Sequence, residues 1–161
     1  MSRRIVERTL FEGAVAPVNI TGAGADGDWV SMAHGRRLGI LLLTGAWAGG
    51  TSAVTLEQAT SAAGAGAKAL GCAEYWSKTG YGATTKFARV AVVSDTFDLS
   101  AASKVHLIEV DAADLDVNGG FTHVRVRAAS PGANADYLAI AYVWIDLREA
   151  GQPENLPDPK A

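Results

Sequence analysis

The sequence is poor in the residues that build most reactive sites. Among its 161 residues are one cysteine, Cys72, and three histidines. A single cysteine excludes an intrachain disulfide and a zinc site built from several thiolates. Cys72 also lacks the sequence context typical of a nucleophile, so we interpret it as a small apolar residue, buried or half-buried.

The sequence also lacks a strong charge excess and a long hydrophobic run. Its formal net charge is −3 with a pI near 5.5. The arginine pairs Arg3–Arg4 and Arg36–Arg37 stand alone, so we expect no nucleic-acid partner. The longest strongly apolar run, Leu38–Thr44, is too short to cross a bilayer. Glu7, Arg8 and Glu12 interrupt any apolar signal segment, and we therefore expect synthesis in a cytosol and no membrane partner.

The stretch Gly22–Gly27 has the G-x-G-x-x-G spacing of dinucleotide-binding loops. Such a loop holds a pyrophosphate only when a helix begins at its last glycine. Here Asp28 and Trp29 lead into a predicted strand, and Asp26 within the loop would repel phosphate. We interpret the stretch as a surface loop and predict no nucleotide site.

The stretch Asp114–Gly119 matches the first half of an EF-hand calcium loop. The twelfth position of such a loop needs a bidentate glutamate, and Arg125 stands there. We interpret the stretch as a turn between strands, in which Asn118, Gly119 and Gly120 supply positive-φ positions.

The three histidines fall on separate predicted elements. His106 and His123 fall on predicted polar faces and could approach each other across paired strands. A zinc site would need a third ligand that the sequence does not supply at metal spacing. We expect His34, His106 and His123 to be surface residues, and we predict no metal, no cofactor, no catalytic residue and no enzymatic activity.

Short apolar or alternating runs, bounded by Gly, Asp, Asn or Pro, recur about every 10–15 residues. About eight or nine such runs predict an all-β, single-domain β-sandwich that is jelly-roll-like. The candidate helix Leu56–Leu70 has Gly64 and Gly66 at its middle and no apolar stripe, so we predict a strand that runs into a loop. A helical turn is predicted near Ala112–Leu115. The predicted strands are Ile5–Phe11, Trp29–Met32, Arg37–Thr44, Ser52–Gln58, Phe87–Val93, Thr96–Leu99, Val105–Val110, Thr122–Ala128 and Tyr137–Leu147.

Alternation along a strand indicates which side chains are buried. In Thr122–Ala128 the two valines are predicted to face inward, and Arg125 and Arg127 outward. Arg37–Thr44 is nearly all apolar, which is typical of a strand buried on both faces.

We predict one domain over residues 1–148, with a short N-terminal arm at 1–7, and a Pro-rich C-terminal tail at 149–161. The tail carries Pro153, Pro157 and Pro159, so it cannot pair in a central strand. It is either disordered or an extended arm that orders on a neighbouring subunit.

Aromatic residues concentrate near strand ends and in the Gly-rich stretch Gly71–Ala83. Three interpretations stay open: they cap the core, they anchor a protein interface, or they form a platform for a sugar. The candidate interface residues, taken from these aromatics and the two arms, are Arg3, Arg4, Trp47, Tyr75, Trp76, Tyr81, Pro153 and Pro157.

Two stretches carry a resemblance to a known group of proteins. They are Thr44–Leu70 (TGAWAGGTSAVTLEQATSAAGAGAKAL) and Leu107–Phe121 (LIEVDAADLDVNGGF), the latter followed by Val124–Val126. The chain resembles, over roughly Asp28–Leu147, small structural proteins that tailed phages and prophages carry among their head genes. The shared motifs are patterns of strands and turns.

The resemblance implies a β-sandwich virion protein on the capsid surface, a decoration or cement protein that binds and stabilises the assembled head. Such proteins form homo-dimers or homo-trimers, contact the major capsid protein and have no catalytic residues. Two alternatives stay open. One is a receptor- or carbohydrate-binding module of a phage tail or spike, and the other is a neck or tail-completion protein.

Overall fold

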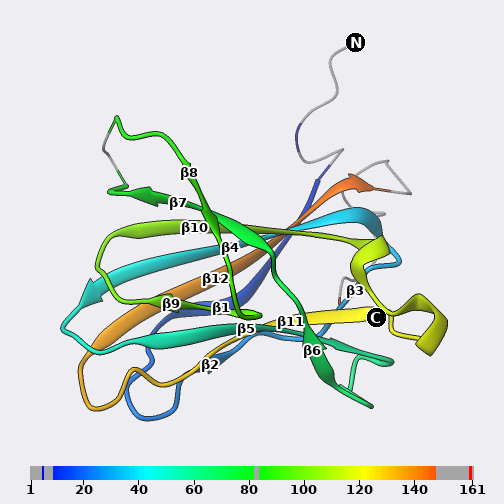
Figure 1. Ribbon diagram of the computed structural model, residues 1–161, viewed down its shortest axis with the longest axis horizontal. Helices are drawn as coiled ribbons and strands as arrows, with labels where there is room; N and C mark the ends of the chain where they lie inside the picture. The colour runs from blue at the N-terminus through cyan, green and yellow to red at the C-terminus, as the bar shows by residue number, and fades with distance from the viewer. Residues whose placement is uncertain (1–4, 6–8, 82–83, 148–159, 161) are drawn as a thin grey trace.

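The computed structural model describes residues 5, 9–81, 84–147 and 160 of the chain. Within them the chain is almost entirely β, as the sequence predicts, and two antiparallel sheets hold twelve strands rather than the eight or nine predicted, because β2, β6 and β7 were not among the predicted strands (Figure 1). The strands are β1 (Leu10–Asn19), β2 (Ala25–Asp26), β3 (Val30–Ser31), β4 (Gly35–Trp47), β5 (Ser52–Ala59), β6 (Lys68–Leu70), β7 (Glu74–Thr79), β8 (Ala88–Ala91), β9 (Thr96–Leu99), β10 (Lys104–Asp111), β11 (His123–Ala128) and β12 (Asp136–Leu147). Two short 3-10 helices, η2 (Ala112–Asp114) and η3 (Val117–Gly119), separate β10 from β11.

The strand order is that of a jelly roll with one insertion. Sheet A has the order β1-β12-β4-β10-β7-β8, and in sheet B β11 and β5 are central. Strands β2 and β3 both pair with β11, and β6 and β9 both pair with β5. When β6, β7 and β8 are set aside, successive strands alternate between the sheets except at β5 and β9, which pair with each other in sheet B, and β1-β12-β4-β10 faces β2/β3-β11-β5-β9. This confirms the predicted sandwich and its jelly-roll character.

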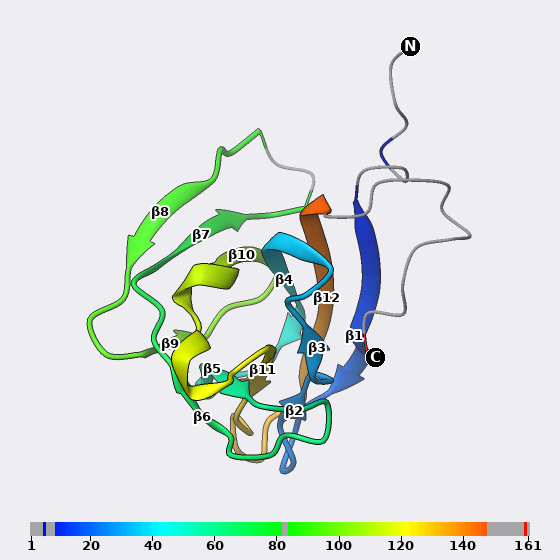
Figure 2. The same cartoon turned by 90° about the vertical axis from the view of Figure 1, so that its right-hand side faces the viewer.

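The two sheets curve towards each other, and the 3-10 helices lie at the end of the sandwich that faces the viewer in Figure 2. The inserted hairpin β7–β8 extends sheet A beyond β10. Asp111 and Asp114 cap η2 reciprocally, each carboxylate accepting a backbone N–H of the other's segment. The predicted helical turn near Ala112–Leu115 is therefore confirmed.

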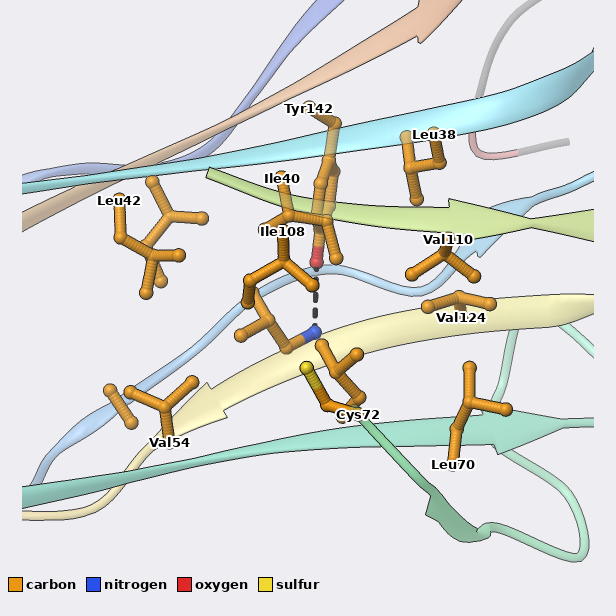
Figure 3. Packing of buried hydrophobic residues seen from close by; sticks show 14 of the residues in the cluster. Leu38, Ile40, Leu42, Val54, Leu70, Cys72, Ile108, Val110, Val124 and Tyr142 are labelled. Atoms are coloured by element: carbon orange, nitrogen blue, oxygen red, sulfur yellow. Dashed lines mark hydrogen bonds between the residues drawn. The ribbon is translucent and has the colours of Figure 1, made fainter. Parts of the chain in front are cut away.

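The hydrophobic core fills the space between the sheets (Figure 3). Sheet A contributes the side chains that point inward from its strands, which are every second residue; in β4 these are Leu38, Ile40 and Leu42. Sheet B contributes Val124 and Val126 of β11, as the alternation predicts. Burial of such aliphatic side chains supplies roughly 1.5–3 kcal/mol each and is the main driving force of the fold.

Two aromatic side chains of β12 reach across the core, and their polar atoms form hydrogen bonds with backbone groups on the other side. The Tyr142 hydroxyl accepts a hydrogen bond from the Val126 backbone N–H at 3.2 Å (Figure 3). It donates to the Asp28 carbonyl at 3.1 Å. The Trp144 indole N–H donates to the Ser31 carbonyl at 3.2 Å. Both side chains are fully buried. They therefore join sheet A to sheet B by directed bonds as well as by packing.

The Tyr142 hydroxyl occupies a break in the sheet B ladder. Strand β2 pairs with β11 at Arg127 and Ala128, and β3 pairs with it at His123 and Val124. Between these two segments the Val126 N–H has no opposing strand, and the hydroxyl takes the place of the missing carbonyl. A buried N–H left without a partner costs about 1–3 kcal/mol, so this bond completes the sheet.

Several strand boundaries differ from the prediction. The first described strand is Leu10–Asn19 rather than Ile5–Phe11, and it accommodates Pro17 because it lies at the edge of sheet A, with register shifts along it. Strand β7 was not predicted, because Gly71–Ala83 is rich in glycine and polar residues. The segment after β5 turns back at Thr60–Ala67 and pairs as β6, so the predicted loop closes a hairpin.

The prediction that His106 lies on the surface was wrong. His106 is 5% exposed and its ring lies beside Tyr75 and Phe97, with centroids 5.5 and 6.2 Å away. Nor does it approach His123, which lies on β11 of the other sheet. The alternation of β10 was assigned to the wrong face because Leu107 on its outer face is as apolar as Ile108 on its inner face.

Removal of the Tyr142 hydroxyl is expected to destabilise the fold. Tyr142→Phe keeps the ring but leaves the Val126 N–H buried without a partner, so we expect the free energy of unfolding to fall by about 1–3 kcal/mol. Urea unfolding followed by tryptophan fluorescence measures the change. Tyr137→Phe, at an exposed position of the same strand, is the matched control and should change stability little. Equal effects of the two variants would contradict the proposed role of the bond.

The buried histidine predicts a pH dependence of stability. Burial, and secondarily the charge of Lys104, lower the pKa of His106 from 6.5 to about 4. The unfolded chain therefore takes up a proton below pH 6.5 that the folded chain takes up only near pH 4. The free energy of unfolding should fall over this interval, by up to about 3 kcal/mol from this residue.

The measurement is a series of urea unfolding curves between pH 7 and 4 for the wild type and His106→Leu. Carboxylates titrate in both proteins, so the difference between the two series isolates the histidine. The wild type should lose stability relative to the variant as the pH falls. Parallel curves would show that His106 is not held neutral by burial.

Candidate interaction surface

The two outer faces of the sandwich differ in chemistry. The outer face of sheet A is largely apolar across five neighbouring strands, whereas the outer face of sheet B is built from charged residues. We define the outer face of sheet A by its outward-pointing apolar residues: Phe11 of β1, Tyr137, Ala139, Ala141, Val143 and Ile145 of β12, Leu41 and Leu43 of β4, Val105 and Leu107 of β10, and Trp76 of β7.

These residues point outward because their neighbours along each strand point into the core. In β12 the buried residues Leu138, Ile140, Tyr142 and Trp144 alternate with them. Phe11 is 55% exposed, Tyr137 44% and Ile145 37%. The 3-10 helices η2 and η3 both lie at one end of the sandwich, away from this face. No described layer therefore covers this face.

The middle of the face has small side chains. Gly39 lies between Val143 and Glu109 on the neighbouring strands, and Ala141 lies beside Leu41. A Cβ added at Gly39 would meet Leu107 at 3.5 Å and Val143 at 3.9 Å, so larger side chains flank a low centre. Charged side chains also lie on this side of the sheet: Glu109 is exposed beside Gly39, and Lys78 of β7 lies beside Val105. Towards the strand ends Arg37 and Asp111 form an ion pair at 3.9 Å.

The outer face of sheet B is built from paired charges. Arg125 Nε lies 2.7 Å from Glu57 Oε2, and Arg127 Nε lies 2.9 Å from Asp26 Oδ1. The Arg125 guanidinium also lies over the Trp29 ring, 4.6 Å from its centroid. The predicted outward orientation of the two arginines is confirmed. Their charges are satisfied within the chain, and the face is suited to water.

A cavity of about 390 Å³ opens between the sheets beside the β6–β7 connection. Its lining includes Cys72, Glu74, Glu109 and Asp114. Cys72 is 8% exposed, as the sequence predicts, and burial raises the pKa of its thiol, which keeps it protonated and unreactive near neutral pH. No group of three metal-binding side chains is present among the described residues.

Two histidines other than the predicted pair come close enough to interact. Burial, and then the charge of His34, lower the pKa of His123. The Thr122 hydroxyl lies 2.9 Å from His123 Nδ1. The Nε2 atoms of both histidines are buried without a hydrogen-bond partner among the described residues. Two imidazoles alone fall short of a zinc site, which needs at least three protein ligands.

The glycine-rich stretch Gly22–Gly27 serves the fold. No helix follows it; β3 does. Gly22 and Gly24 have φ of 74° and 75°, which turn the chain from β1 into β2. Gly27 is required for another reason, because a Cβ there would collide with the Tyr142 hydroxyl. The glycine spacing that resembles a nucleotide loop is thus explained by a turn and a close approach.

The calcium-like stretch Asp114–Gly119 is a pair of helical turns. The Asp116 carboxylate accepts the Gly119 N–H at 3.0 Å and binds Lys68 Nζ at 2.6 Å. The side-chain bond from Lys68, together with the N–H bond from Gly119, lowers the pKa of Asp116. Gly120 has φ of 79°, as the turn interpretation predicts.

The three aromatics of Gly71–Ala83 do not form one platform. Tyr75 points into the sandwich, where its ring stacks on Phe97 with a centroid distance of 4.1 Å. Trp76, one residue along β7, belongs to the opposite, outer face. Tyr81 donates to the Thr44 carbonyl near Leu43 and Tyr137, at the end of the outer face of sheet A.

The remaining candidate interface residues divide into two groups. Trp47, at the end of β4, packs against the core and donates its indole N–H to the Gly50 carbonyl at 3.1 Å. Arg3, Arg4, Pro153 and Pro157 lie outside the described residues. At the C-terminal end, Lys160 Nζ lies 2.7 Å from Asp28 and 3.5 Å from Glu12.

The apolar outer face of sheet A was not predicted, although the sequence carries a signal for it. Arg37–Thr44 and Tyr137–Leu147 are apolar at both phases of the alternation. The two runs are neighbours in the sheet, and their outward halves form one surface. Arg37–Thr44 was predicted to be buried on both faces. In the described chain its inner face is buried, whereas Leu41 and Leu43 on its outer face are half-buried.

Comparison with known proteins adds one structural likeness. No family model and no curated protein matches the chain. The crystal structure of the SPBc2 prophage-derived protein YomS is similar with a TM-score of 0.41 and 10% identity, over 83% of this chain and 92% of that chain. No described helix is long and apolar enough to span a membrane.

The contact between Gly27 and Tyr142 predicts that substitutions at the two positions have coupled effects on the free energy of unfolding. Gly27→Ala should destabilise the fold, because the new methyl group displaces the tyrosine hydroxyl from the Val126 N–H. In the Tyr142→Phe background part of that cost should disappear, so the two effects should fall short of additivity by roughly 0.5–3 kcal/mol. Urea unfolding of the four proteins measures this. Gly13→Ala, where a Cβ meets nothing within 4 Å, is the control; additive effects at Gly27 and Tyr142 would contradict the contact.

Proposed function

We propose that the chain is a structural virion protein of a tailed phage, a decoration or cement protein that binds and stabilises the assembled head. The observation that carries this proposal is the broad apolar outer face of sheet A, backed by the resemblance over Asp28–Leu147. A sandwich with one apolar and one charge-paired outer face is equipped to join protein surfaces. The proposal includes no enzymatic activity, and a location on the capsid surface after synthesis in the host cytoplasm.

The physical basis of such a role is selective binding. A protein that binds the assembled shell, and not its free subunits, stabilises the shell by mass action. Many copies on a regular lattice also let weak individual contacts act together. A compact jelly roll with its core closed by Tyr142 and Trp144 keeps its shape on binding, so little conformational entropy is lost.

The alternative functions receive less support. A carbohydrate-binding module would need neighbouring aromatic rings that face the same way. Tyr75 and Trp76 lie on opposite faces of sheet A, which removes the platform that suggested this function. A neck or tail-completion protein would use similar contact surfaces and differs from a decoration protein in copy number.

Cosedimentation tests the proposal directly. Purified protein is mixed with undecorated heads of the phage or prophage that carries its gene, and bound copies are counted by quantitative mass spectrometry. We expect saturable binding of hundreds of copies at a fixed ratio to the major capsid protein, and no binding to the free capsid subunit. Heads that already carry the protein serve as the control for non-specific pelleting. No binding, or about a dozen copies per particle, would contradict a decoration role and favour the neck or tail.

A further inference from the structure

The cavity beside the β6–β7 connection is large enough to hold an organic group. Its volume is about 390 Å³, within the roughly 300–1,000 Å³ range of ligand pockets in proteins. A metal ion would fill little of this space, because even a water molecule takes up only about 30 Å³ of the liquid. The described residues also provide no group of three metal-binding side chains. The cavity therefore favours an organic group over an inorganic ion.

The cavity lies where two neighbouring strands separate. Strand β7 pairs with β10 from Trp76 to Thr79, opposite Leu107 to Lys104. On the N-terminal side of β7 the chain leaves β10 and crosses through Gly71–Ala73 to β6 in sheet B. Among the described residues no strand pairs with β10 beyond Leu107 on this side, so the cavity lies along an open stretch of strand edge. Extended protein segments bind such edges and place side chains in the adjacent pockets.

The floor of the cavity is apolar. Leu56 and Leu70 of sheet B and Val110 of β10 line it, and each is at most 4% exposed. Figure 3 shows Val110 pointing from β10 towards the side of sheet B, where Leu70 and Cys72 lie. An aliphatic chain that enters the cavity would be removed from water by these side chains.

The rim of the cavity is acidic. Glu74, Glu109 and Asp114 line it, and the described lining contains no basic side chain. Burial raises the pKa of the Cys72 thiol, and the charges of Glu74 and Asp95 raise it further, so the potential at the cavity wall is negative. The rim therefore repels an anionic ligand and attracts a cation.

Two of the rim carboxylates have no cationic partner within the described part of the chain. Glu74 pairs with Arg89 of β8. Glu109 and Asp114 form no such ion pair, and the arginines at the start of β4 pair with Asp111 instead. Asp114 Oδ2 accepts the Asp111 N–H at 2.8 Å, which leaves Oδ1 available. Glu109 and Asp114 can therefore receive a cation from outside the chain.

We propose that this cavity binds an arginine or lysine side chain from an extended segment of a partner protein. The alkyl stem lies against the apolar floor, and the guanidinium or ammonium group stays at the rim beside Glu109 and Asp114. Such a side chain matches both parts of the lining, whereas a purely apolar group would leave the carboxylates without a cation. The inference concerns the isolated protein and does not depend on the proposed attachment to a phage head.

NMR titration of the purified full-length chain tests the site without phage heads. The probe is the peptide acetyl-Ser-Val-Arg-Val-Ser-amide, with a second version that carries lysine in place of arginine. Both should bind with a Kd of about 1 mM and shift the methyl signals of Leu56, Leu70 and Val110. The methyl signals of Leu41 and Leu43, on the outer face of sheet A, should stay unchanged. Shifts confined to residues away from the cavity would overturn the proposal.

Neutral versions of the peptide separate charge from shape. Citrulline keeps the outline of arginine without its charge, and norleucine keeps the stem of lysine without its ammonium group. Both should bind at least about 3-fold more weakly than the charged peptides. Equal binding of the four peptides would contradict a role for the acidic rim.

A variant of the rim tests the same point from the side of the protein. Glu109→Gln changes an exposed side chain, so the fold should be kept, and it should weaken binding of the arginine peptide about 3-fold. Glu12→Gln is the matched control, because it is the same change on β1, three strands away from β10, and it should leave the Kd unchanged. A folded Glu109→Gln protein with the wild-type Kd would overturn the proposal.

A free amine distinguishes a protein segment from a small-molecule ligand. n-Butylamine carries the stem and the ammonium group of lysine but has no backbone to pair with the edge of β10. It should bind at least about 3-fold more weakly than the lysine peptide, because it lacks main-chain hydrogen bonds. Binding as tight as that of the peptide would overturn the assignment to a protein segment and identify a site for small free amines.

Discussion

The central constraint on this fold is that β4 and β12, the neighbouring strands in the middle of sheet A, are apolar on both faces. Alternation sends half of each strand inward, where Leu38, Ile40 and Leu42 meet sheet B. The same alternation sends Leu41, Leu43 and Val143 outward. A sheet with two apolar faces needs cover on both, and the jelly roll provides it on one. The buried core and the exposed apolar surface therefore have the same cause, which is that β4 and β12 are apolar on both faces.

On the inner face the packing is made specific by β12. Aliphatic contacts alone tolerate sliding of one sheet over the other, whereas the hydrogen bonds of Tyr142 and Trp144 to backbone groups of sheet B fix one position. The hydrogen bond of Tyr142 also constrains residues far from it in the sequence. The Tyr142 hydroxyl stands where a Cβ of residue 27 would lie, so glycine is needed there, and the break between β2 and β3 is where the hydroxyl replaces a strand.

Alternation in the sequence identified the buried face of a strand where the two faces differ in polarity. In β11 the alternation of Val126 with Arg125 and Arg127 identified the buried face correctly, because the outer face of sheet B meets water. In β10 the same reasoning placed His106 outside, because it presumes that an outer face is polar. The role of Gly27 was hidden for a different reason. Its requirement comes from Tyr142, far away in the sequence, and local patterns such as G-x-G-x-x-G carry no information about such a contact.

The different chemistry of the two faces also bears on how the protein would act on a particle. The ion pairs of sheet B leave that face suited to water, so attachment to another protein surface would use the outer face of sheet A. Rigidity matters for such attachment, because strands and side chains that move freely in the unbound protein lose conformational entropy on binding. The hydrogen bonds of Tyr142 and Trp144 across the core hold the two sheets in one position, so the residues that fix the fold would also support attachment.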